Sequence, residues 1–183
     1  MNNKLEFHYI VCIIFLEKSY YFLWKDNLFF ISDINNKLLF KNNENDLILT
    51  AKSHKLSVSD QETHTIDIDH AFKILKQMRC DRSLSERSSH VLLDCLNVLE
   101  DMAKTLKIPV GIQTHEENTS LNHIYDKIFW GNNLPAITPE GKSYSPVLLP
   151  NEIKIIREYL RGLWDKIYLN LLSDDDLTPA KLV

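Results

Sequence analysis

Histidine is the residue type in this chain that most directly invites a chemical role, because its imidazole binds metals and transfers protons near neutral pH. Seven histidines are present. The pairs His64 with His70 and His115 with His123 lack the spacing of two ligands on one helical face, and no pair of cysteines accompanies them. The spacing therefore predicts no metal site and no cofactor, with the histidines in solvent or at helix ends.

The three cysteines are the next candidates for chemistry. Their odd number and wide spacing predict no disulfide framework and indicate a reducing compartment, so we expect a cytoplasmic protein. A cysteine nucleophile needs a low thiol pKa and a partner base. Cys12 falls in an apolar strand and Cys95 on an apolar helix face, where a thiolate is disfavoured. Cys80 lies between Arg79 and Asp81, but the sequence supplies no partner base for it.

Carboxylates occur as neighbouring pairs, namely Asp67 with Asp69, Glu100 with Asp101, and Glu116 with Glu117. As catalytic acid and base they lack a frame that would set their separation. Glu100 and Asp101 are predicted on a solvated helix face. The other two pairs lie at the ends of elements or in loops, where they can cap a helix or meet a partner.

Sequence motifs for phosphate, dinucleotide or acyl chemistry are missing from the chain. There is no Walker loop, no dinucleotide fingerprint and no Gly-x-Ser-x-Gly elbow. We therefore predict no catalytic residues and a protein that is not an enzyme. A net charge of −4 also disfavours a general nucleic-acid binder, which carries a basic footprint.

An apolar run from Tyr9 to Leu16 is the one segment that imitates a targeting signal. It spans eight residues, far fewer than a membrane helix needs. Glu6 lies on its N-terminal side, and no small-residue cleavage site follows it. We interpret the run as a strand and predict neither a membrane partner nor a signal peptide.

The first forty residues predict the sheet that would position these side chains. Apolar residues alternate along the first strand, at Leu5, Phe7, Tyr9, Val11, Ile13 and Phe15. Breaks at 17–19, at Asp26-Asn27 and at Asn35-Asn36 divide the stretch into four antiparallel strands that end at Phe40. The second face is apolar from Ile10 to Leu16, so we expect both faces to be covered there.

The remainder of the chain predicts helices. Amphipathic spacing places them at 47–56, 70–79, 83–106, 119–129 and 150–171. Asn45 or Asp46 should cap the first helix, Ser83 and Glu86 form a capping box for the third, and Pro150 opens the last. Gly131 should end the fourth helix in a left-handed conformation. The segment 132–149 is long and irregular, which is typical of a functional loop or of one draped over the core.

The predicted fold class is α+β, with an N-terminal antiparallel β-meander of about four strands packed against a C-terminal set of amphipathic helices. Residues 1–172 form a single domain, with the meander at 1–40 and a mainly helical part at 46–172. Residues 173–183 form a flexible acidic tail.

One stretch of the sequence resembles a known family. It is similar to immunity proteins of bacterial polymorphic toxin systems, in particular those of contact-dependent growth inhibition. The similarity is carried by Tyr20 to Trp24, by Phe29 to Phe40 and by a predicted helix over Asn43 to Lys55. In several of these an aromatic strand, a turn with Asp and Asn, a short strand ending in Phe and a helix follow in that order. The similarity covers roughly residues 20–56 and is a hairpin pattern, with no functional motif.

The resemblance implies a protein that binds and neutralises a cognate toxin domain in the cytoplasm. The partner would be the C-terminal domain of a cell-surface effector, frequently a nuclease, whose active site or substrate-binding surface is blocked. Strand addition by the toxin is one mode seen among such proteins, and an open sheet edge permits it. Because the family has no shared catalytic residues, none is transferred to this chain.

The acidic side chains complete this hypothesis. We predict that five acidic residues of this chain contact a basic toxin surface, namely Asp33, Asp67, Asp69, Glu116 and Glu117. Opposite charge would accelerate the encounter of the two proteins. Two alternatives remain open. One is a small-molecule-binding or hydrolytic enzyme whose site is assembled from distant residues under the 132–149 segment, and the other is a phage or plasmid accessory protein.

Overall fold

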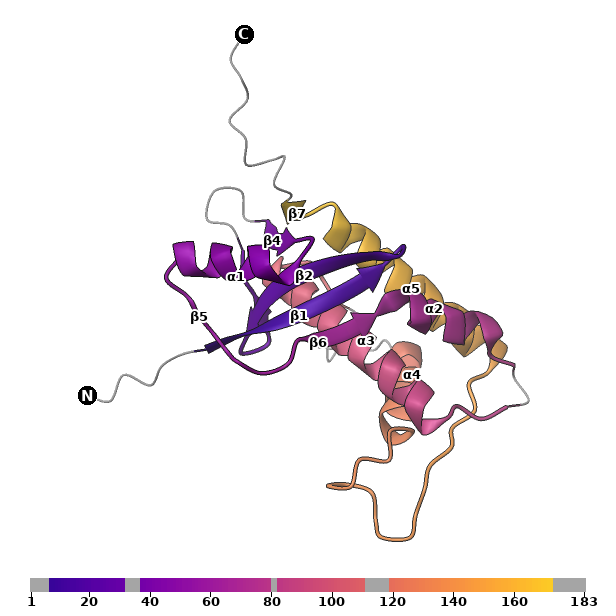
Figure 1. Ribbon diagram of the computed structural model, residues 1–183. Helices are drawn as coiled ribbons and strands as arrows, with labels where there is room; N and C mark the ends of the chain where they lie inside the picture. The colour runs from indigo at the N-terminus through magenta and orange to yellow at the C-terminus, as the bar shows by residue number, and fades with distance from the viewer. Residues whose placement is uncertain (1–6, 32–36, 80–81, 111–118, 173–183) are drawn as a thin grey trace.

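The computed structural model describes residues 7–31, 37–79, 82–110 and 119–172. These residues form a seven-stranded sheet and five helices, which confirms the predicted α+β class (Figure 1). The strands are β1 (Phe7–Phe15), β2 (Lys18–Lys25), β3 (Leu28–Phe29), β4 (Leu38–Lys41), β5 (Ser57–Val58), β6 (His64–Asp67) and β7 (Leu171–Leu172). The helices are α1 (Glu44–Ser53), α2 (Ile68–Gln77), α3 (Glu86–Thr105), α4 (Thr119–Trp130) and α5 (Pro150–Tyr168).

The β1–β2 hairpin is the centre of the sheet. It pairs antiparallel from Tyr9 opposite Trp24 to Phe15 opposite Lys18. The turn between β1 and β2 uses Leu16 and Glu17, and the turn between β2 and β3 uses Asp26 and Asn27, all four at positive φ. This is the backbone of a tight two-residue hairpin turn. The predicted turn at Asp26-Asn27 is therefore confirmed, while the first turn lies one residue earlier than the predicted break.

The fourth strand continues the expected meander only in part. Strand β4 pairs mainly with β2, with Phe40 opposite Phe22, and meets the end of the predicted third strand at one antiparallel bridge, between Ile31 and Leu38. The reason lies in helix α3, because the Thr105 hydroxyl accepts the Phe29 amide at 3.0 Å and so occupies the outer edge of β3. The predicted turn at Asn35-Asn36 lies outside the described residues.

Three further strands make the sheet mixed instead of purely antiparallel. Strands β5 and β6 both pair parallel with β1, and β7 pairs parallel with β4. The path across the sheet runs β5-β1-β2-β4-β7. Strands β5 and β7, of two residues each, carry too little periodic pattern to be recognised from sequence.

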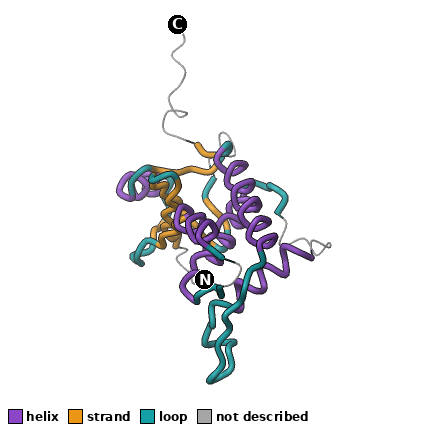
Figure 2. Tube along the Cα trace, turned by 90° about the vertical axis from the view of Figure 1, so that its right-hand side faces the viewer, coloured by secondary structure: helices purple, strands orange, loops and turns teal. Residues whose placement is uncertain are grey.

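Helices cover both faces of the sheet, as the apolar second face of β1 predicts (Figures 1 and 2). On one face α1 contributes Leu47 and Ala51 to a small cluster with Ile10 and Leu23. The larger core on the other face joins α2, α3, α4 and α5 to the sheet. Leu16, expected to be covered as well, is 69% exposed because it lies in the tight turn.

Helix α3 runs through the middle of the larger core, in contact with α2, α4, α5, β3 and β6. Burial extends around it to include a carboxylate: Glu100 is 3% exposed. The predicted solvated face at Glu100 and Asp101 is therefore wrong. Glu100 borders the apolar stripe, four residues after Leu96 and three before Ala103, and Tyr159 of α5 packs over it.

Helix ends follow local capping chemistry, with three shifts from prediction. The α1 cap is Asn43, whose side chain accepts the amide of Asp46. The α3 cap is Ser85, which accepts the amide of Ser88 and displaces the predicted box at Ser83. At the end of α4 the positive φ falls at Asn133, and Gly131 serves close packing instead. Pro150 opens α5 as predicted.

Within the ranges described, every helix is too short or too polar to cross a membrane.

Gly131 and Gly162 provide a matched test of this packing. A Cβ on Gly131 would lie 2.3 Å from the Ser89 hydroxyl oxygen and 2.9 Å from the Pro146 ring, whereas a Cβ on Gly162 meets nothing within 4 Å. Gly131→Ala should therefore destabilise the fold by about 1–3 kcal/mol through overpacking. Gly162→Ala lies in the interior of α5 and should stabilise it by about 0.5–1 kcal/mol.

Urea unfolding followed by circular dichroism measures both changes. Equal stability of the Gly131→Ala variant and the parent protein would show that α4, α3 and the following segment do not meet as closely as described.

Candidate functional site

Two of the five predicted partner-binding carboxylates are described, and both accept backbone amides. Asp67 caps α2 by accepting the His70 amide at 2.8 Å. Asp69 accepts the amides of Leu16 and Glu17 at 3.0 and 2.9 Å and so stabilises the β1–β2 turn. Because non-glycine residues at positive φ are strained, this side chain compensates a local cost of the turn.

The remaining three predicted positions, Asp33, Glu116 and Glu117, lie outside the described residues. The structure therefore brings together only Asp67 and Asp69, on the first turn of α2. That any of the five contacts a partner stays a prediction.

Cysteine and metal chemistry find little support where the structure is described. Cys12 and Cys95 are buried free thiols, and burial raises the pKa of each, which disfavours the thiolate. Cys80 lies outside the described residues. Over residues 7–31, 37–79, 82–110 and 119–172, no three histidine, cysteine or acidic side chains converge so as to hold a metal ion.

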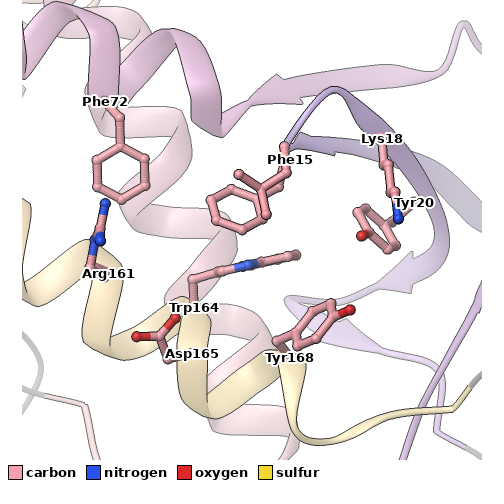
Figure 3. A pocket seen from close by; sticks show the side chains of 9 residues that line it. Phe15, Lys18, Tyr20, Phe72, Arg161, Trp164, Asp165 and Tyr168 are labelled. Carbon is pink, nitrogen blue, oxygen red and sulfur yellow. The ribbon is translucent and has the colours of Figure 1, made fainter.

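An aromatic cavity of about 370 Å³ lies beside the β1–β2 turn, between β1, β2, α2 and α5. Its lining is Phe15, Leu16, Lys18, Tyr20, Phe72, Arg161, Trp164, Asp165 and Tyr168 (Figure 3). Trp164 forms the centre of an aromatic group, with its ring 4.9 Å from Phe15, 6.0 Å from Tyr20 and 6.2 Å from Tyr168. The sequence gives no signal of a cavity, because its lining comes from elements far apart in the chain.

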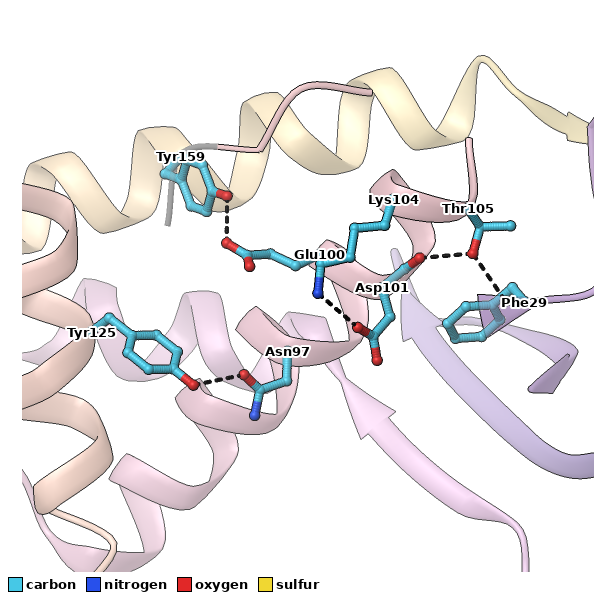
Figure 4. A network of polar contacts seen from close by, with 8 residues as sticks. All are labelled: Phe29, Asn97, Glu100, Asp101, Lys104, Thr105, Tyr125 and Tyr159. Carbon is cyan, nitrogen blue, oxygen red and sulfur yellow. Dashed lines mark hydrogen bonds and ion pairs between the residues drawn. The ribbon is translucent and has the colours of Figure 1, made fainter. Parts of the chain in front are cut away.

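A network of polar contacts joins α3 to α5 and to the sheet (Figure 4). The Tyr159 hydroxyl of α5 donates to Glu100 at 2.7 Å, and Lys104 pairs with Asp101 at 3.4 Å. Burial raises the pKa of Asp101, an effect that Lys104 opposes. Since each carboxylate is held by a neighbouring side chain, this network holds elements together and exposes no free acid–base pair.

Two histidines flank one carboxylate at the junction of β6 and α3. The Nε2 atoms of His90 and His64 lie 3.3 and 4.0 Å from the same oxygen of Asp94. The other ring nitrogen of His90 lies 3.2 Å from the side-chain oxygen of Asn132, which is buried. The sequence missed this group because its members come from three elements far apart in the chain.

The segment between α4 and α5, residues 131–149, is the most prominent feature of the surface. It projects from the helical layer in both views (Figures 1 and 2). Large apolar side chains stay exposed on it and on the adjoining end of α4, namely Trp130, Leu134, Ile137, Tyr144, Val147 and Leu149. Their exposed fractions run from 36% to 56%. We call this segment the projecting loop; it is not draped over the core.

Hydrogen bonds close the projecting loop at its base. The Asn133 side chain accepts the Tyr144 amide at 2.6 Å and donates to the Tyr144 carbonyl at 3.1 Å. The Leu84 amide donates to the Pro146 carbonyl at 2.7 Å, and Leu148 is fully buried. The two legs are therefore tied to each other and to the start of α3.

A groove of about 450 Å³ lies between α4 and the returning leg of the projecting loop. Its lining is His123, Asp126, Lys127, Trp130, Tyr144, Ser145 and Pro146. The rings of Trp130 and Tyr144 lie 5.5 Å apart across it. An apolar groove beside exposed aromatic rings can receive side chains of another protein.

Comparisons with known proteins identify no family for this chain. Neither the protein-family models nor the curated protein sequences gave a match. Among solved structures, the crystal structure of the SatS C-terminal domain in complex with bromine aligns over 90% of this chain and 92% of that chain. The TM-score is 0.42 at 11% identity, so this similarity carries no argument about fold or function.

Glu152 links α5 to the base of the projecting loop. This residue should make the stability of the folded protein depend on pH. Burial alone would raise the pKa of Glu152, but hydrogen bonds from Lys127 and from the Leu149 amide outweigh it and lower the pKa. The ionised group therefore stabilises the fold above its unfolded pKa of about 4.3. This contribution is lost as the pH falls through the lower folded-state value.

Glu152→Gln should thus cost about 1–2 kcal/mol at pH 7, with the difference from the parent protein shrinking toward about pH 3. Urea unfolding at several pH values measures it. The matched control is Glu158→Gln on the exposed face of α5, which should change stability little at any pH. A cost at Glu152 that is independent of pH would contradict the assigned ionised state.

Proposed function

We propose that this protein acts by binding another protein and performs no catalysis, and that its partner is the C-terminal domain of a bacterial toxin. It would be an immunity protein of the contact-dependent growth inhibition type, the family that residues 20–56 resemble. The observation that carries the binding role is the projecting loop, because it combines exposed apolar side chains with a closed base.

Exposed apolar surface gives the loop its binding energy. Isolated exposed apolar residues are common on protein surfaces, but a contiguous group is typical of an interaction site. Here the exposed apolar residues follow one another along the loop and continue onto Trp130 of α4. Aromatic residues beside a groove, as Trp130 and Tyr144 are, resemble the anchors that dominate protein interfaces.

Internal hydrogen bonds of the loop reduce the entropic cost of binding. The tip carries its own turns, with the amides of Ile137 and Thr138 both donating to the Leu134 carbonyl. The base is closed through Asn133 and Pro146. Each side chain or loop residue ordered on association lowers affinity, so a loop that is ordered beforehand binds more tightly.

Sheet edges support strand addition less well than the loop supports direct contact. The strands that flank β1, namely β5 and β6, have two and four residues, and β7 at the other end of the path has two. The outer edge of β3 is occupied by Thr105. Short or covered edges offer few free amides and carbonyls to an incoming strand.

The net charge of the whole chain suits a basic toxin domain. The chain carries a net charge of −4, while the toxin domain is expected to be basic because it acts on nucleic acid. The tip of the projecting loop itself carries one acidic and one basic residue, Glu140 and Lys142. Charge would therefore accelerate encounter, and the apolar side chains would hold the complex.

Ile137→Asp tests the projecting loop as the contact surface. It places a charge on the exposed apolar tip and should weaken binding at least about tenfold, while circular dichroism and stability stay unchanged. The matched control is Leu49→Asp, which is 62% exposed on α1 at the other side of the sheet. Binding is measured by capture of an inactive form of the toxin domain encoded immediately upstream, and by survival of cells that express the active toxin.

Three results separate the parts of this proposal. Failure of the parent protein to capture the upstream toxin domain or to protect cells would contradict the immunity role. Full capture by a folded Ile137→Asp variant would leave the immunity role in place and contradict the loop contact. Loss with Leu49→Asp but not with Ile137→Asp would place the contact on α1. Asp67 and Asp69 are avoided because their replacement would also alter the fold.

A further inference from the structure

Asp126 is a carboxylate on the wall of the groove between α4 and the projecting loop, and it is exposed. Among the residues that the structure describes, its side chain makes no hydrogen bond and no ion pair. Asp67, Asp69 and Glu152, in contrast, each accept backbone amides. The negative charge of Asp126 is therefore available to a molecule that enters the groove.

The positive charge of Lys127, on the same lining, is already paired. Its Nζ lies 2.7 and 2.8 Å from the two oxygens of Glu152 and donates to the Val147 carbonyl at 3.3 Å. The Nε2 of His123 lies 3.9 Å from an oxygen of Glu152, so a protonated His123 would meet the same carboxylate. Asp126 is left as the uncompensated charge on this lining, and the groove therefore favours a cation.

Aromatic rings lie beside this carboxylate. Asp126 and Trp130 are four residues apart on α4, so they are neighbours on one helical face, with Cβ atoms about 5–6 Å apart. The centroids of the Trp130 and Tyr144 rings lie 5.5 Å from each other, and both side chains are exposed. The face of such a ring attracts a cation, most strongly for tryptophan. A cation in the groove can thus meet a ring face and a carboxylate at once.

A guanidinium group suits these two features better than an ammonium group. It is planar and stacks on an aromatic face, while the N–H groups at its edge remain free for a carboxylate. Arginine is also one of the residues that dominate protein interfaces, together with tryptophan and tyrosine. The partner proposed above is expected to be basic, so its surface offers arginine side chains.

We propose that the groove between α4 and the projecting loop receives an arginine side chain of the partner protein. The guanidinium stacks on the exposed face of the Trp130 ring, beside Tyr144, and its edge pairs with Asp126. This arginine site rests on the proposed toxin binding for the identity of the partner, and it adds the kind of side chain that the partner supplies. It is separate from the tip contact, because Ile137 does not line the groove.

The indole N–H signal of Trp130 reports on this groove directly. The signals of the three tryptophans, Trp24, Trp130 and Trp164, are assigned in proton–nitrogen spectra by single replacement with Phe. Titration of the free protein with Nα-acetyl-arginine N-methylamide, at constant ionic strength, should shift the Trp130 signal in a saturable manner. The Trp24 and Trp164 signals should stay in place, because neither residue lines the groove.

Two analogues of this probe test the chemistry of the site. The citrulline analogue has nearly the same shape without the charge and should bind at least about fivefold more weakly. The lysine analogue keeps the charge on a group that does not stack, and it should bind at least about threefold more weakly.

Asp126→Asn removes the charge of the site and keeps its shape. It should weaken binding of the arginine probe at least about threefold. Capture of the upstream toxin domain should weaken at least about tenfold, because the pair is shielded from water in the complex. The matched control is Glu62→Gln, an exposed carboxylate between β5 and β6 and outside the groove, which should change both by less than about twofold. Circular dichroism confirms that both variants are folded.

The results separate the arginine site from the proposed function. A saturable Trp130 shift without capture of the toxin domain by the parent protein would support the site and contradict the immunity role. Capture without a saturable Trp130 shift would leave the immunity role in place and overturn the arginine site. Equal binding of the arginine probe and either analogue, or equal weakening by Asp126→Asn and Glu62→Gln, would overturn it as well.

Discussion

Burial of most of the surface of α3 is the constraint that the rest of the structure depends on. Its apolar stripe packs on the sheet and α2, and α4 and α5 cover its flanks, while one strip that includes His90 and Asn97 stays exposed. A helix buried in this way cannot leave polar groups unpaired without cost, so Glu100 receives the Tyr159 hydroxyl and Thr105 bonds to the edge of β3. These two hydrogen bonds attach α3 to α5 and to the edge of β3.

The same constraint positions the projecting loop. Its first leg leaves α4 at Gly131, whose Cα lies so close to Ser89 of α3 that a side chain has no room. Its second leg bonds through Pro146 to Leu84, just before α3 begins. Both legs are therefore attached to one end of the central helix. This attachment explains how a long irregular segment can project into solvent and still keep a defined shape.

Local rules of sequence predicted the α+β class, the hairpin turn at Asp26-Asn27 and the start of α5 at Pro150, because each depends on neighbouring residues alone. Features that depend on distant packing were missed. Glu100 looked solvated until α5 covered it, and the aromatic cavity needs Phe15 and Trp164 to meet from opposite ends of the chain. The sequence identified 132–149 as unusual, but its exposure follows only from the way it joins α3.

The central claim is that the projecting loop is ordered before any partner arrives, and residue-resolved amide hydrogen exchange of the free protein tests it most directly. The amides of Tyr144 and Leu84 donate to Asn133 and Pro146, so both should exchange at least about tenfold more slowly than in an unstructured chain. The amide of Glu140 at the tip makes no such bond among the described residues and should exchange fast. Exchange of Tyr144 and Leu84 at unstructured rates would contradict the account.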